Sequence, residues 1–138
     1  MPNNDEIRWQ QRLDHLQKAF TELDEACAQT TYNKLERAGV IQLFELTFEL
    51  AWKTLQDLLA YEGQTLQVGG AKTVLRQAHQ VALIDDIDGW FAMLEDRNRL
   101  SHAYDEQTVI ATVDSIRSAY RGKLQTLVDT LEDRRGTA

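Results

Sequence analysis

Beyond its second residue the chain contains no proline, although it is 138 residues long. A β-sandwich or barrel of this size needs many turns, which are rich in proline and glycine, and the seven glycines here are spread thinly. The sequence therefore predicts an all-α fold. The length fits one domain, for which we expect the bounds 1–138.

Apolar residues recur at helical spacing along most of the chain. In residues 5–30 they follow steps of four and three, a narrow seam that suits packing in a bundle: Trp9, Leu13, Leu16, Phe20, Leu23 and Cys27. A short helix is expected over residues 71–82 and a longer one over 87–99. The last helix begins at Asp105, and residues 134–138 are expected to fray. These segments predict an antiparallel up-down four-helix bundle with an extra short helix.

The second helix, residues 33–62, has an unusually wide apolar face. It begins with a capping box of Asn33 and Glu36 and ends at Gly63. Two adjacent apolar stripes cover more than half of its circumference, and a helix on the surface of a bundle needs less. We therefore expect it to contact a second copy of the chain as well, which gives a homodimer. The residues expected at this dimer or partner interface are Phe44, Phe48, Trp52, Glu45 and Glu49, although a solvated face also explains the two acids.

Net charge and cysteine content exclude several classes of protein. With 22 acidic and 15 basic residues the net charge is −7, which argues against a protein that coats nucleic acid but leaves room for a local basic site. A single cysteine, Cys27, excludes a disulfide framework and a cysteine-based zinc site. No signal peptide and no run of 18 apolar residues is present, so we expect a cytoplasmic protein that does not cross a membrane.

Motifs for metals and nucleotides are absent or incomplete. None of the three histidines has a glutamate three residues before it, which excludes the Glu-x-x-His pattern of di-metal bundles. Residues 69–73 (GGAKT) lack the first glycine of a phosphate-binding loop and read as a turn before a helix. Asp86 and Asp88 lack a preceding Gly-Ser and read as helix caps. We therefore expect neither a metal nor a cofactor.

Residues 97–104 (RNRLSHAY) form a dense polar run directly after an aromatic segment. Arginine binds phosphate oxygens through a fork of donors, and histidine transfers protons near neutral pH. Arg97 and His102 lie on different faces of an unbroken helix, so they converge only if the helix ends near Ser101 or if two copies face each other. Without a metal, this pair suffices to cleave RNA through its own 2′-hydroxyl. The alternative is a polar helix end in which His102 caps carbonyl groups.

Two segments resemble the HEPN superfamily. Arg97 and Asn98, followed by His102 and Tyr104, match its Arg-x(4–6)-His motif with a trailing tyrosine. Residues 35–53 (LERAGVIQLFELTFELAWK) resemble the signature of one branch, the nucleotidyltransferase substrate-binding proteins, and the likeness extends over about residues 8–132. The resemblance implies a helical bundle that forms a homodimer and works with a minimal nucleotidyltransferase encoded nearby, often as a toxin and its antitoxin.

The resemblance also implies roles for individual residues. Arg97 would stabilise the phosphate during metal-independent RNA cleavage, His102 would act as acid or base, and Asn98 would orient the site. Tyr104 would accept AMP from the partner, and this bulky anion would block RNA. Independently of the resemblance, we expect Arg99, with Arg117 and Arg121, to add local positive charge for RNA, concentrated in one cleft where two copies of the chain face each other. Two alternatives stay open: a non-catalytic subunit that presents substrate to the nucleotidyltransferase, and a plain interaction module.

Overall fold

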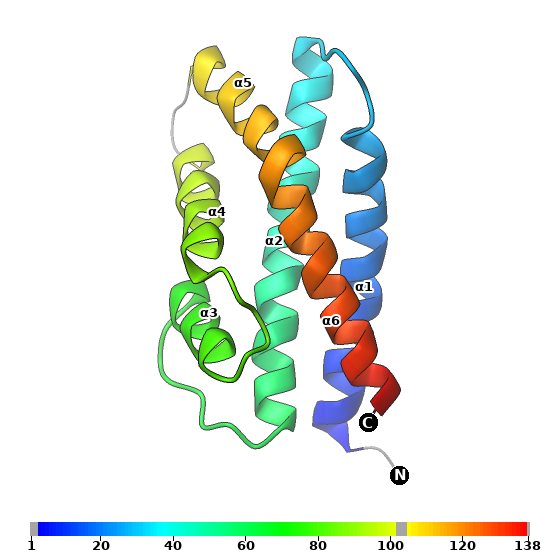
Figure 1. Ribbon diagram of the computed structural model, residues 1–138, viewed down its shortest axis with the longest axis vertical. Helices are drawn as coiled ribbons and strands as arrows, with labels where there is room; N and C mark the ends of the chain where they lie inside the picture. Colours follow the sequence, from blue (N-terminus) through cyan, green and yellow to red (C-terminus); the bar gives the residue numbers. More distant parts are fainter. Residues whose placement is uncertain (1–2, 102–104, 138) are drawn as a thin grey trace.

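The computed structural model describes residues 3–101 and 105–137, and every regular element in these ranges is helical (Figure 1). The elements in chain order are α1 (Asn4–Ala26), α2 (Lys34–Tyr61), α3 (Ala71–Gln80), α4 (Ile87–Leu100), α5 (Glu106–Ser115), the π-helical turn η1 (Ile116–Tyr120) and α6 (Arg121–Thr137). No helix in the described ranges is long and apolar enough to span a membrane.

The long helices run alternately up and down (Figure 1). Helix α1 runs beside α2, α4 rises along the other side, and α5 with α6 descends across the front, while the short α3 precedes α4 at the lower end. The predicted up-down bundle with an extra short helix is therefore confirmed. The apolar seam of the first helix is also confirmed, because its first five members are buried in the common core.

Most predicted helix ends agree with the structure, and two do not. The capping box of Asn33 and Glu36 is formed, Asp86 and Asp105 cap α4 and α5, and Gly63 adopts a φ of 81° just after α2. The first helix ends at Ala26 rather than near residue 30, and α6 continues to Thr137, where fraying was expected. Ion pairs of α6 with Glu62 and Asp14 hold this last turn against its neighbours.

Helix α2 is the centre of the bundle, and this position explains its wide apolar face. It packs against α1, α3, α5 and α6, and its Phe48 ring lies 6.2 Å from the Trp90 ring of α4. Phe44 and Phe48 have no exposed surface. The prediction that these two phenylalanines form a dimer interface is therefore wrong, because the chain's own helices cover them. Trp52, Glu45 and Glu49 remain half-exposed, and Leu46 is 48% exposed.

The last helical segment contains one irregularity that the periodicity did not predict. Between α5 and α6 the backbone forms the π-helical turn η1, which holds one more residue per turn than an α-helix would. Its ends, Ile116 and Tyr120, are both buried, and the Tyr120 ring stacks on Phe44 at 5.6 Å. The π turn therefore lets the segments on either side of it face the same core.

Candidate functional site

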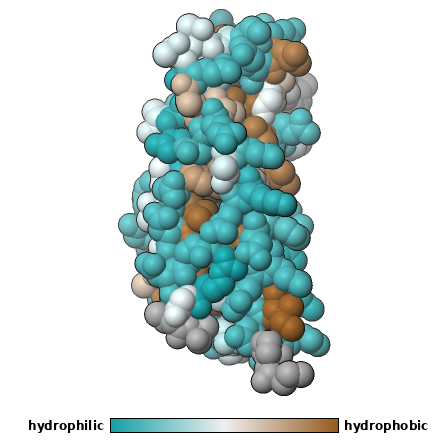
Figure 2. Space-filling view, turned by 90° about the vertical axis from the view of Figure 1, so that its right-hand side faces the viewer, coloured by the Kyte–Doolittle hydropathy of each residue, from teal (hydrophilic) through white to brown (hydrophobic). Residues whose placement is uncertain are grey.

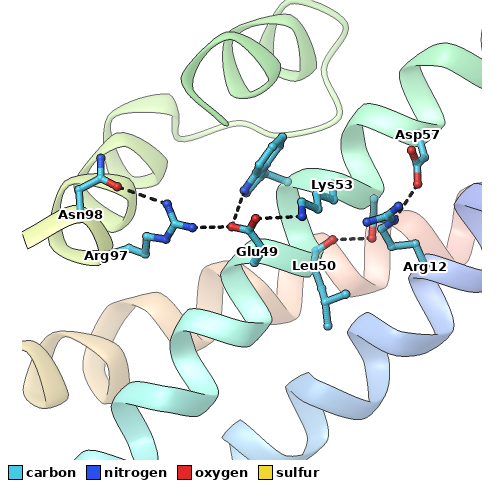
Figure 3. Close-up of polar contacts among 9 residues, drawn as sticks. Arg12, Glu49, Leu50, Lys53, Asp57, Arg97 and Asn98 are labelled. Carbon is cyan, nitrogen blue, oxygen red and sulfur yellow. Dashed lines mark hydrogen bonds and ion pairs between the residues drawn. The ribbon is translucent and has the colours of Figure 1, made fainter. Parts of the chain in front are cut away.

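The predicted site begins on the last turn of α4, and its first contact is with α2. Asp86 starts this helix by accepting from the Gly89 amide, and Trp90 and Met93 bury one face, which leaves Arg97 half-exposed two turns further on. Its Nη2 donates to Glu49 Oε2 at 2.7 Å (Figure 3). Residues 48 positions apart in the chain thus form one ion pair across the α2–α4 contact.

Glu49 is held by three donors. Besides Arg97, Trp52 Nε1 donates to its Oε2 at 3.0 Å, and Lys53 Nζ lies 3.1 Å from its Oε1 (Figure 3). Burial raises the pKa of Glu49, but the hydrogen bonds from Trp52 and Lys53 and the charge of Arg97 outweigh it, so the pKa lies below its ordinary value. Glu49 is therefore an anion at neutral pH and fixes the direction of Arg97.

The guanidinium of Arg97 keeps donors available on its other side. Its Nη1 makes a long contact of 3.4 Å with the Asn98 side chain, and about a third of the Arg97 side chain is exposed. A guanidinium has five N–H donors, and the two contacts with Glu49 and Asn98 use only some of them. The arrangement can therefore present the remaining donors to an anion such as a phosphate.

Arg99, predicted to bind RNA, is engaged by acids of its own helix. Its Nη1 donates to Asp96 at 2.7 Å, and its Nη2 lies 3.5 Å from Glu95. Asp96 also accepts from the Tyr120 hydroxyl at 2.5 Å, and burial together with this hydrogen bond raises the pKa of Tyr120 well above its usual range. An RNA phosphate would have to compete with two carboxylates for Arg99.

Arg117 and Arg121 do not extend the Arg97 site. Arg117 donates to the carbonyl oxygens of Cys27 and Gln29 at the end of α1 and lies over the Tyr32 ring at 4.7 Å. Arg121 pairs with Asp24 of α1 at 2.8 Å. Within one chain both arginines are bound at the C-terminal end of α1, and the expected concentration of their charge in a cleft between two copies stays a prediction.

His102 and Tyr104 lie outside the described residues. In the sequence they stand between Ser101, which follows α4, and Asp105, which caps α5. Close to Asp105 there is a groove of about 470 Å³ between the N-terminal parts of α2 and α5. It is lined by Lys34, Ala38, Ile41, Gln42, Glu45, Asp105, Glu106 and Val109. Within the described ranges, no group of three metal-binding side chains is present.

Comparisons with known proteins agree with this architecture. A family model described as "Nucleotidyltransferase substrate binding protein like" matches residues 11–133. The chain belongs to this family. The resemblance of the chain to the nucleotidyltransferase substrate-binding branch of the HEPN superfamily is thereby confirmed.

Three similar proteins illustrate the relationship. A Haemophilus influenzae protein named "Probable ribonuclease HepT" is 37% identical over 82 residues, which are 57% of this chain and 56% of that protein, so the match spans about half of this curated relative. A crystal structure from Thermus thermophilus has a TM-score of 0.75 at 30% identity and covers 84% of this chain and 98% of that one. HI0074 of Haemophilus influenzae, described as the fold of a nucleotidyltransferase substrate-binding domain, has a TM-score of 0.76 at 28% identity, with 87% and 98% covered.

The ion pair between Glu49 and Arg97 was not predicted from the sequence. The signal was partly visible, because Glu49 precedes Lys53 by one turn in the polar arc of the second helix, and that pair is formed at 3.1 Å. Nothing in the spacing of a single sequence links residues 49 and 97. The prediction placed Glu49 at an interface, whereas its carboxylate faces Arg97 of the same chain.

Proposed function

We propose that this chain is the HEPN-family subunit of a two-component system with a minimal nucleotidyltransferase, and that it acts as a metal-independent endoribonuclease toxin in the cytoplasm. The observation that carries the proposal is Arg97, an ionised and half-exposed guanidinium at the end of α4, five residues before His102. The similarity of the chain to a protein named probable ribonuclease supports the same reaction. The proposed catalytic unit is one HEPN-like domain over residues 1–138.

The proposed reaction needs only side chains and RNA. The 2′-oxygen attacks the adjacent phosphorus, the bond to O5′ breaks, and the products are a 2′,3′-cyclic phosphate and a 5′-hydroxyl. The 2′-hydroxyl loses a proton and the leaving O5′ gains one; His102 transfers one of these two protons, and water carries the other. Arg97 stabilises the charge that develops on the phosphate oxygens, with Glu49 and Asn98 holding it in place. Arg99 would contribute to RNA binding after release from its acids.

The homodimer and the regulation by the partner belong to the same proposal. Glu45 and the half-exposed Trp52 lie two turns apart on one face of α2, and Glu45 lines the groove between α2 and α5. We propose this face as the contact with a second copy of the chain. We propose that the nucleotidyltransferase transfers AMP to the Tyr104 hydroxyl with release of pyrophosphate. A phosphate group two residues from His102 would repel and obstruct the RNA phosphate.

Expression of the chain without its partner tests the proposal. The wild type should arrest growth, and the purified chain should cleave RNA in the presence of EDTA. Arg97→Ala and His102→Ala should abolish both effects, whereas Arg8→Ala, which removes an exposed arginine of α1, should leave both unchanged. A wild-type chain that is harmless at high expression and leaves RNA intact would contradict the proposal.

A second candidate is a non-catalytic subunit that presents substrate to the nucleotidyltransferase. It is favoured by the description of HI0074 as a nucleotidyltransferase substrate-binding domain and by the neutralisation of Arg97 by Glu49. In that case nucleotide transfer to a third molecule would require this chain. A partner that modifies Tyr104 and nothing else would exclude this candidate.

A further inference from the structure

The α3–α4 side of the molecule carries two cations that no acid of the described ranges neutralises. Lys72 and Arg76 are exposed and lie one turn apart on α3. Both lie over the half-buried ring of Phe91 of α4, with Lys72 Nζ 5.4 Å and Arg76 Cζ 5.7 Å from its centroid. Across the described part of the chain most basic side chains pair with a carboxylate, but neither of these two does. Their charge is therefore available to an anionic ligand.

The two cations are held on a fixed support. Helix α3 buries Val74, Leu75 and Ala78 in the core, and the buried Gln77 donates to the Thr65 carbonyl at 2.9 Å, which ties the preceding loop to the helix. Contact with the Phe91 ring restricts both long side chains and favours their charged heads there. Little ordering is then needed when a ligand binds.

The same helix links this pair to Arg97. Phe91 and Asn98 are seven residues apart on α4, two turns, so they lie on one face about 10 Å apart along the axis. Glu95 lies between them, but its carboxylate is directed to Arg99 at 3.5 Å. Arg97 lies about 120° round the helix from Phe91, but its Nη1 reaches to 3.4 Å from the Asn98 side chain. A polyanion that follows α4 from Lys72 and Arg76 would therefore meet this end of the Arg97 guanidinium.

Six acidic residues lie on a different side, while five others lie on or beside α4: Asp85, Asp86, Asp88, Glu95 and Asp96. A groove between α1 and α6 is lined by six carboxylates and one lysine, with Arg121 and Arg135 neutralising part of that charge. Helices α1 and α6 lie on the side of the bundle away from α3 and α4 (Figure 1), and that side is largely hydrophilic (Figure 2). The net charge of −7 is therefore only partly located at α3–α4, where Lys123 pairs with Asp86 and Arg99 with Asp96.

We infer that Lys72 and Arg76 form a phosphate-binding subsite for single-stranded RNA, which positions the strand along α4 so that a phosphate further on reaches Arg97. The inference rests on the proposed ribonuclease function for the identity of the polyanion. Single-stranded nucleic acid is bound in this way by basic tracks that follow its backbone without reading its sequence. The subsite would favour long RNA over short fragments, because a dinucleotide bound at Arg97 cannot reach α3.

Binding measured separately from cleavage tests the inference. The probe is a fluorescein-labelled single-stranded RNA of about 12 nucleotides, a length within the range that single-strand sites cover. Its 2′-O-methyl groups remove the attacking hydroxyl, so the probe binds without being cleaved. Anisotropy titrations over a range of salt concentrations compare the wild type with Lys72→Gln, Arg76→Gln and the double variant. Because one phosphate contact contributes about 0.7 to the salt slope on a single strand, the double variant should lose about 1.4. Lys18→Gln, an exposed lysine of α1, is the matched control for Lys72→Gln and should keep the wild-type slope.

Cleavage assays separate this inference from the proposed function. With unmodified RNA, the double variant should show a lower kcat/KM on the long strand and an unchanged kcat/KM on a dinucleotide. Binding through Lys72 and Arg76 without any cleavage would refute the ribonuclease and leave the subsite standing. Absence of RNA binding by the wild type, or an unchanged salt slope in the double variant, would overturn the subsite. The subsite would also be overturned by a double variant that binds RNA normally but no longer binds the nucleotidyltransferase partner.

Discussion

The ion pair between Glu49 and Arg97 can be measured by a double-mutant cycle in the free energy of unfolding. The variants are Glu49→Gln, Arg97→Gln and the combination. Glu49→Gln keeps the side-chain size, Arg97→Gln shortens the side chain but keeps it polar, and both remove charge. Both side chains are about 30% exposed, 29% for Glu49 and 32% for Arg97, and their atoms are 2.7 Å apart. Exposed pairs contribute about 0.2–1 kcal/mol, and hydrogen bonds to charged groups about 1.5–3 kcal/mol, so this pair should couple by about 1 kcal/mol.

Urea denaturation at low and high salt supplies the four free energies of the cycle. For a chain of this length 1 kcal/mol corresponds to a shift of roughly 3 °C in Tm, which thermal melting can check. The coupling should shrink at high salt, because the pair is partly open to solvent. It should also be lost as the pH falls below the ordinary value of 4.5, because the lowered pKa of Glu49 makes the anion the stabilising form. A coupling within about 0.3 kcal/mol of zero, the scatter of independent sites, would refute the assignment of Glu49 as the partner of Arg97.

Three further predictions address the fold. Phe48→Ala should lower the free energy of unfolding by about 3–5 kcal/mol while the folded protein keeps the oligomeric state of the wild type in sedimentation, because the ring is wholly inside the chain. Asn33→Ala should cost about 1 kcal/mol in urea denaturation, because it removes the side chain that accepts from the Glu36 amide. Burial outweighs the Arg12 charge and raises the pKa of Asp57, so its contribution to stability is largest below its ordinary value of 3.8 and falls as the pH rises through the native value. The difference in unfolding free energy between wild type and Asp57→Asn should follow that direction, and a difference that grows in favour of the wild type with rising pH would contradict it.

Helix positions were predictable from the sequence because local chemistry determines them. Asn33 and Glu36 form their capping box within a single turn, and the seam from Trp9 to Leu23 requires only the period of one helix. Which elements cover an apolar helix face, by contrast, depends on tertiary packing and not on the local sequence. Phe44 and Phe48 looked like surplus apolar surface because the sequence does not say that α2 is surrounded by other helices.

The candidate site was predictable in its composition but not in its contacts. From residue types alone, the polar run 97–104 could be proposed as a site that binds a phosphate group. The carboxylate that holds Arg97 comes from a helix 48 residues earlier, and the acids that occupy Arg99 compete with its expected ligand. Arg117 donates to the Cys27 carbonyl and Arg121 pairs with Asp24, so both contact the end of α1 rather than the site. These contacts depend on tertiary packing, which residue types alone do not predict.

The π turn between α5 and α6 sets the orientation of α5 about the helix axis relative to α6. Each residue of an α-helix advances the side chains by about 100°, so if η1 wound as an ordinary α-helix with all its residues kept, the extra residue would rotate α5 by about that angle against α6. Glu106 would then swing away from Arg37 of α2, to which it is joined at 2.6 Å, and the groove beside Asp105 would lose one wall. The single extra residue therefore determines which face of the bundle Asp105 and the first turn of α5 occupy.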